Sequence, residues 1–208
     1  METSYSTDPE KNVFINCPFD DDYTRLLHPL LFTILYLGFN PRIATESTNT
    51  NNQRIDRICE LIKISKYSIH DISRLRSTKK NQFYRLNMSF ELGIFYGCQR
   101  FATNHHKNKQ FLVIEKDQYK YAIALSDLAG VDIKSHNNEP FKVIEIVRNW
   151  LAGFIKKKTI DASEDILKNF DLFMRNLAEE RDKKGFTKYN MLRVELNTKS
   201  PLTEYENC

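Results

Sequence analysis

The chain has few glycines, 6 in 208 residues, and none of them belongs to a Gly-rich phosphate-binding loop. Neither GxGxxG nor the P-loop pattern GxxxxGKS/T occurs, which excludes the usual dinucleotide-binding and P-loop classes. Cysteine is also scarce: Cys17, Cys59, Cys98 and Cys208 form no CxxC pair. Scattered thiols of this kind are typical of packing residues rather than of a zinc site or a disulfide framework. We therefore expect neither a metal nor a resident cofactor.

Long hydrophobic runs are missing as well. No apolar segment is long enough to cross a bilayer, and the first residues, METSYSTDPEKN, are polar where a secretion signal needs an apolar core. We therefore expect a cytoplasmic location and no membrane partner. The formal charge of +4 is small for this length. Nucleic acid binding through the lysines at 156–158 and 183–184 therefore ranks last among the functions considered.

The composition that is present, 41% hydrophobic and 28% charged, fits one folded α/β domain with an extension. Short β-prone runs at 12–19, 40–45, 66–73 and 109–116 predict four strands, and a weaker run at 130–133 predicts a fifth. Helical spacing of apolar residues between these runs predicts intervening helices, including one over about 87–101. Strands that alternate with helices indicate a parallel sheet with helices on both faces.

Two helices without strands follow Pro140, because apolar residues recur at helical spacing over 141–154 and 166–177. Gly38 is placed to end the helix that follows the first strand, and Pro29 predicts either a kink or a helix that begins near it. We divide the chain into a flexible leader (1–11), an α/β domain (12–139), a helical extension (140–185) and a tail (186–208).

Ligands of an open parallel sheet bind beyond the carboxyl ends of its strands, so the candidate site residues are those that follow the strand runs. Two carboxylates, Asp71 and Glu91, are the catalytic candidates, because a carboxylate can trap or stabilise the oxocarbenium-like state of a glycosidic bond. Glu91 is expected near a helix N-terminus, where the backbone dipole favours its ionised form. The binding candidates are Asn16, Cys17, Pro18, Phe19, Asp20, Arg42, Glu46, Ser73, Asn87 and Met88.

Structural roles for these residues stay open. A glutamate early in a helix is often a dipole partner, and an aspartate after a strand often binds its own backbone. Phe19 is the preferred residue for stacking on a base. Arg42, Arg54 and Arg85 could bind a phosphate, or each could form a solvent-facing salt bridge. His70 should face away from Asp71, because neighbouring strand residues alternate between faces, and a lone histidine there is more often packed or solvent-exposed than catalytic.

Three segments, VFINCPFDDDY, SIHDIS and NMSFELGIFYG, together resemble the nucleoside 2-deoxyribosyltransferase family, which in turn resembles the Toll/interleukin-1 receptor (TIR) domains that cleave NAD. The resemblance implies that Pro18 and Phe19 follow the first strand, that Asp71 binds the ribose and that Glu91 is the nucleophile. Asn16 and Cys17 depart from the family, which usually has small residues there. The helices after Pro140 are additional to those of the compact transferases, and the serine-rich segment of TIR enzymes is absent.

These residues and the resemblance predict a flavodoxin-like sheet of about five parallel strands and an enzyme that cleaves or transfers at the N-glycosidic bond of a nucleotide or nucleoside. NAD is a candidate substrate, and the resemblance implies a possible role in bacterial anti-phage defence. The alternative is a non-catalytic module that senses a nucleotide in the same crevice. The resemblance also implies a homo-oligomer, and the C-terminal helices are candidates for contact with a protein partner.

Overall fold

The computed structural model describes residues 8–44, 54–74, 86–156 and 159–184. Glu46, Arg85, the expected tail (186–208) and most of the expected leader (1–11) lie outside these ranges. Five parallel strands form one sheet in the order β2-β1-β3-β4-β5. The strands are β1 (Asn12–Asn16), β2 (Asn40–Ile43), β3 (Tyr67–Asp71), β4 (Gln110–Glu115) and β5 (Lys134–Ser135). This order is that of a flavodoxin-like fold, as the alternation of strands and helices predicts.

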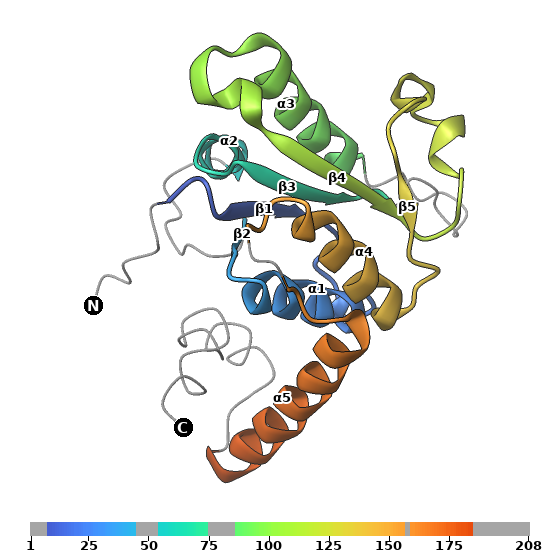
Figure 1. Ribbon diagram of the computed structural model, residues 1–208. Coiled ribbons are helices and arrows are strands. Elements are labelled where there is room, and N and C mark those ends of the chain that lie inside the picture. The colour runs from blue at the N-terminus through green and yellow to red at the C-terminus, as the bar shows by residue number, and fades with distance from the viewer. Residues whose placement is uncertain (1–7, 45–53, 75–85, 157–158, 185–208) are drawn as a thin grey trace.

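Helices cover both faces of the sheet (Figure 1). One face packs against α1 (Thr24–Tyr36) and α4 (Pro140–Ala152), and the other packs against α2 (Arg54–Lys63) and α3 (Asn87–Phe101). Short 3-10 helices, η1 (Asn104–Asn108), η2 (Tyr121–Ile123) and η3 (Ser126–Leu128), lie in the connections on either side of β4. In the part of the chain that the structure describes, no helix is long and apolar enough to span a membrane.

The strand sequences explain the two-sided packing. Val13 and Ile15 of β1 join the core cluster of α1 and α4, whereas Phe14 between them joins the cluster of α2 and α3. Both β1 and β3 are buried along their whole length, because helices cover both faces of this parallel sheet. The apolar run identified β1, whereas β3 buries Ser68, His70 and Asp71, which are hydrogen-bonded inside the protein.

The last helix, α5 (Ser163–Lys184), packs on the body through its first half and then extends away from it (Figure 1). Ile166 is fully buried beside Phe32 and Ile144, and Phe170 and Phe173 contact the ring of Phe32. The two helices expected after Pro140 are therefore present and dock on α1.

The structure corrects the position of the fifth strand, and of the two alternatives for Pro29 it excludes a helix that begins near this residue. The fifth strand is not at 130–133 but at Lys134–Ser135, because Val131 and Ile133 lie in tight turns, where they pack against the cluster that contains Val113 and Tyr121. Helix α1 begins at Thr24, well before Pro29, which lies inside it. Gly38 follows α1 with a φ of 79°, the left-handed conformation that glycine adopts at helix C-termini.

Candidate functional site

Asp71 ends β3 and has no exposed surface. Its Oδ2 accepts hydrogen bonds from the Tyr23 hydroxyl (2.5 Å) and from His136 Nε2 (3.1 Å). Its Oδ1 accepts from the backbone N–H of Ser73 (2.8 Å) and from the Ser73 hydroxyl. A carboxylate offers about four acceptor positions. Donors of the protein itself therefore occupy all acceptor positions of Asp71. These hydrogen bonds join β3 to the segments that precede α1 and α4.

The neighbours of His136 determine which of its nitrogens is protonated. The backbone N–H of Asn138 donates to Nδ1 (3.0 Å), so Nδ1 is an acceptor and Nε2 carries the proton that points to Asp71. Ser73 Oγ is 3.1 Å from the same Nε2. Because Nε2 is a donor, it does not accept a proton from Ser73, and these residues do not form a nucleophilic triad.

Glu91 lies on α3 and is 4% exposed. Arg54, the first residue of α2, places its Nη2 3.1 Å from Glu91 Oε1. Burial raises the pKa of the Glu91 carboxyl, and Arg54 acts in the opposite direction. The expectation that a helix dipole keeps Glu91 ionised is wrong: α3 begins at Asn87, so Glu91 lies beyond the first turn, where the dipole effect is concentrated.

A buried hydrogen-bonded pair fixes the start of α3. Asn16 Nδ2 donates to the carbonyl of Met88 (2.7 Å) and lies 2.9 Å from His70 Nδ1. His70 packs against the rings of Phe14 and Phe95, and burial lowers its pKa to about 3, so it stays neutral at physiological pH. Of the two structural roles that the sequence left open for His70, packed or solvent-exposed, the structure shows the packed one. Asn16 thereby positions the helical turn that leads to Glu91.

Cys17 lies among the acidic groups of the site. Its side chain is buried, and burial, followed by the charges of Asp71, Glu91 and Asp20, raises the pKa of its thiol well above 9. Asp20 in turn forms a two-pronged ion pair with Arg74 (2.6 and 2.7 Å). Three carboxylates from separate segments therefore act on one thiol at the carboxyl edge of the sheet.

The structure brings together the predicted residues Asn16, Cys17, Asp20, Asp71, Ser73, Met88 and Glu91. Pro18 is buried beside Cys17, Arg42 is buried on β2, Phe19 is 37% exposed, and Asn87 is exposed at the first position of α3. Glu46 and Arg85 lie outside the described residues. The predicted binding roles of these residues stay predictions.

Sequence reasoning missed Tyr23, Arg74 and His136 as members of this cluster, and it considered Arg54 for a phosphate or for a solvent-facing salt bridge but not as a partner of Glu91. Tyr23 follows the end of β1 and Arg74 follows the end of β3. Both could have been found, because ligands of a parallel sheet bind beyond the carboxyl ends of its strands. No local signal marks His136, because its partner Asp71 is 65 residues away. Among the residues that the structure describes, no group of three or more His, Cys, Asp or Glu side chains could hold a metal ion.

No protein-family model and no curated protein sequence matches this chain.

Proposed function

We propose that the protein cleaves or transfers at the N-glycosidic bond of a nucleotide or nucleoside, with NAD among the candidate substrates, and that Glu91 is the nucleophile. The observation that supports this most is a carboxylate 4% exposed, paired with one arginine, at the same sheet edge as Cys17 and Asp71. A buried carboxylate that is paired with a cation has little solvation, yet it is ionised when the pH exceeds its pKa. Those are properties of a nucleophile for a sugar carbon.

The reaction has two steps. In the first, an oxygen of Glu91 forms a bond to the sugar C1′ while the bond from C1′ to the base nitrogen breaks, and the electron pair leaves with the base. A pyridinium base such as nicotinamide leaves neutral, whereas a purine takes up a proton from water. In the second step, water or an acceptor attacks C1′, loses its proton to solvent and releases the Glu91 carboxylate.

The role of Asp71 in this proposal depends on its hydrogen bonds. All acceptor positions of its carboxylate are occupied by Tyr23, Ser73 and His136. To bind a sugar hydroxyl, Asp71 must exchange one of these donors. Ser73, which is only partly buried, is the donor most easily exchanged. Without such an exchange, Asp71 positions the loop after β3 instead.

The saturated carboxylate of Asp71 also supports the second candidate, a module that binds a nucleotide without cleaving it. In either case, we propose that the chain works in the cytoplasm as a homo-oligomer, with α4 and α5 available for a protein partner, and that it serves in anti-phage defence. Leu172 on α5, which is 41% exposed, is an apolar residue available for such a contact.

The experiment that separates the two candidates measures base release by liquid chromatography. Wild-type protein is incubated with NAD and a panel of nucleosides and nucleotides, next to Glu91→Gln. The matched control is Glu60→Gln, which alters an exposed glutamate of α2 paired with Lys63. We expect base release by the wild type and the control, and a loss on the order of a thousandfold in Glu91→Gln.

Mass spectrometry of the quenched reaction should find the sugar attached to the peptide that contains Glu91. If no candidate releases base in any variant while one of them still binds, the enzymatic proposal is wrong and the sensing module stands. If Glu91→Gln cleaves as fast as the wild type, another residue is the nucleophile.

A further inference from the structure

Arg54 and Glu91 form an ion pair that joins the first residue of α2 to the second turn of α3. The distance from Nη2 to Oε1 is 3.1 Å, and the two side chains differ sharply in exposure, 58% for Arg54 and 6% for Glu91. A cation at the first position of a helix is opposed by the helix dipole. Helix stability therefore does not explain an arginine here, whereas the contact with a buried carboxylate does.

The other groups around Glu91 do not supply positive charge. Cys17 remains a neutral thiol and Asp71 is acidic. His70, on the strand that faces α3, is held neutral by burial, and its ring nitrogens contact Asn16 and Ser68. Among the described residues, Arg54 is the one charged group that lowers the pKa of Glu91. Removing one partner of a pair whose other member is buried leaves that charge uncompensated.

The contact also distinguishes the two oxygens of Glu91. Arg54 binds Oε1, and in the described part of the chain Oε2 makes no hydrogen bond. We propose that Arg54 is a positioning residue that stabilises the negative charge of Glu91 and, by holding Oε1, leaves Oε2 as the atom that attacks the sugar. This inference rests on the proposed function, in which Glu91 is the nucleophile.

The test measures the charge of Glu91 directly and separately from activity. The protein is labelled with ¹³C at the glutamate carboxyls, and the resonance of Glu91, assigned by its loss in Glu91→Gln, is followed by NMR as a function of pH. The variants are Arg54→Gln, the conservative Arg54→Lys, and the control Lys63→Gln, which alters an exposed ion pair on the same helix.

We expect the midpoint of the Glu91 titration to rise in Arg54→Gln, to return toward the wild-type value in Arg54→Lys and to stay unchanged in Lys63→Gln. The acid limb of the pH profile of kcat/KM should move by the same amount as the Glu91 midpoint. At pH values below the midpoint, kcat/KM should fall about tenfold for each pH unit by which the midpoint rises, and at higher pH it should recover. A merely structural arginine would lower activity equally at every pH.

A second measurement does not depend on whether Arg54→Gln folds. Because Arg54 is mostly exposed, 1 M NaCl should screen the pair and raise the Glu91 midpoint in the wild-type protein. An unchanged midpoint in high salt would overturn the inference even if base release is observed, and so would an unchanged midpoint in a folded Arg54→Gln variant. A displaced midpoint without base release from any substrate would support the role of Arg54 in the charge of Glu91 and refute the proposed reaction.

Discussion

His136 Nε2 lies 3.1 Å from Asp71 Oδ2, and this hydrogen bond joins the turn before α4 to the end of β3. Asn137 and Asn138 of this turn both have positive φ, and Arg25 of α1 holds the turn in place by donating to the carbonyl of Asn138. The C-terminal half of the chain therefore contributes directly to the candidate site. Asp71 is the point where β3, α1 and α4 are connected by polar contacts.

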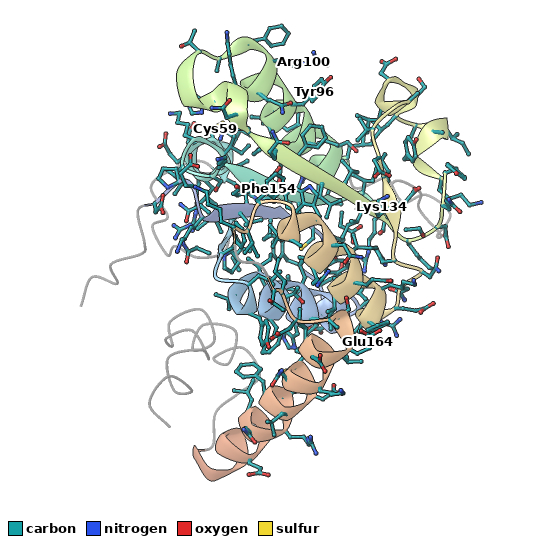
Figure 2. The ribbon with its side chains drawn as sticks, in the orientation of Figure 1. Cys59, Tyr96, Arg100, Lys134, Phe154 and Glu164 are labelled. Carbon is teal, nitrogen blue, oxygen red and sulfur yellow. The ribbon has the colours of Figure 1, made fainter. Side chains whose placement is uncertain are left out.

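The first prediction concerns the Tyr23 hydroxyl, which donates to Asp71 over 2.5 Å. We expect Tyr23→Phe to lower the free energy of unfolding by about 1.5–3 kcal/mol, because a buried carboxylate loses one of its donors. Urea denaturation followed by circular dichroism measures the change. The control is Tyr96→Phe, because Tyr96 and Arg100 lie on α3 (Figure 2) and the Tyr96 hydroxyl accepts its hydrogen bond from Arg100. This control should change stability by less than about 0.5 kcal/mol. Equal effects of both substitutions would contradict the assigned role of Tyr23.

Particular residues show why much of the fold could be predicted from the sequence. In a strand, Phe14 can be buried together with Val13 and Ile15 only where both faces of the sheet are covered, and the structure places them so. The sequence predicted β5 at the wrong residues. Only two residues of β5 pair with β4, and the apolar residues Val131 and Ile133 before them pack in a cluster of loop residues instead. Apolar content alone does not distinguish a strand from a packed turn.

The candidate site could be predicted only in part. Residues after strand ends, such as Cys17 and Asp71, do converge, because parallel strands end at one edge of the sheet. His136 could not be found, because its role arises from a long-range contact that no local pattern encodes. The cause that governs the ionisation of Glu91 was misjudged, since its pKa depends on burial and on Arg54 of another helix rather than on the dipole of its own helix.

The second prediction concerns stability at acid pH. The folded-state pKa of His70 is about 3, below the ordinary value of 6.5, so the unfolded chain binds more protons between these pH values. The contribution of His70 is therefore fully present above pH 6.5 and is lost as the pH falls toward 3. From pH 6.5 to 4 we expect a loss on the order of 3 kcal/mol from this residue.

Comparison with His70→Gln isolates that contribution, because the other titrating groups are the same in both proteins. Urea denaturation of the two proteins at several pH values measures the difference in unfolding free energy. We expect this difference to shrink as the pH falls from 6.5 to 4. A difference that does not change with pH would mean that His70 is not held neutral in the folded protein.

The third prediction concerns thiol reactivity. The thiolate is the reactive form of cysteine, and burial with the charge of Asp71 raises the pKa of Cys17 well above 9. Cys59 is only partly buried. In the native protein at pH 8, iodoacetamide should modify Cys17 at least about tenfold more slowly than Cys59. Peptide mapping by mass spectrometry measures both rates, and in 8 M urea the two residues should react alike. Equal rates in the native protein would show that Cys17 is accessible.

The fourth prediction concerns Lys109, a lysine that is 1% exposed. Its Nζ donates to the carbonyls of Ile62 (2.6 Å) and Ser65 and lies 5.1 Å from the centre of the Phe95 ring. These carbonyls belong to the end of α2 and the turn after it, where backbone acceptors lack helical partners. Lys109→Met should therefore lower the free energy of unfolding by about 2 kcal/mol at pH 7.

The stability lost in Lys109→Met should depend on pH if the amine of Lys109 is buried, and should not depend on pH if only the packing of the side chain matters. Burial lowers the pKa of Lys109 to about 8, so between pH 8 and its unfolded value near 10.5 the unfolded chain binds more protons. The wild type should gain stability over this range relative to Lys109→Met, by up to about 3 kcal/mol, whereas below pH 8 the deficit should stay constant. Lys63→Met, which alters an exposed lysine of α2, should show no such trend. Urea denaturation at pH 7, 8, 9 and 10 decides the matter, because a deficit that is the same at every pH would mean that the amine of Lys109 keeps its ordinary pKa.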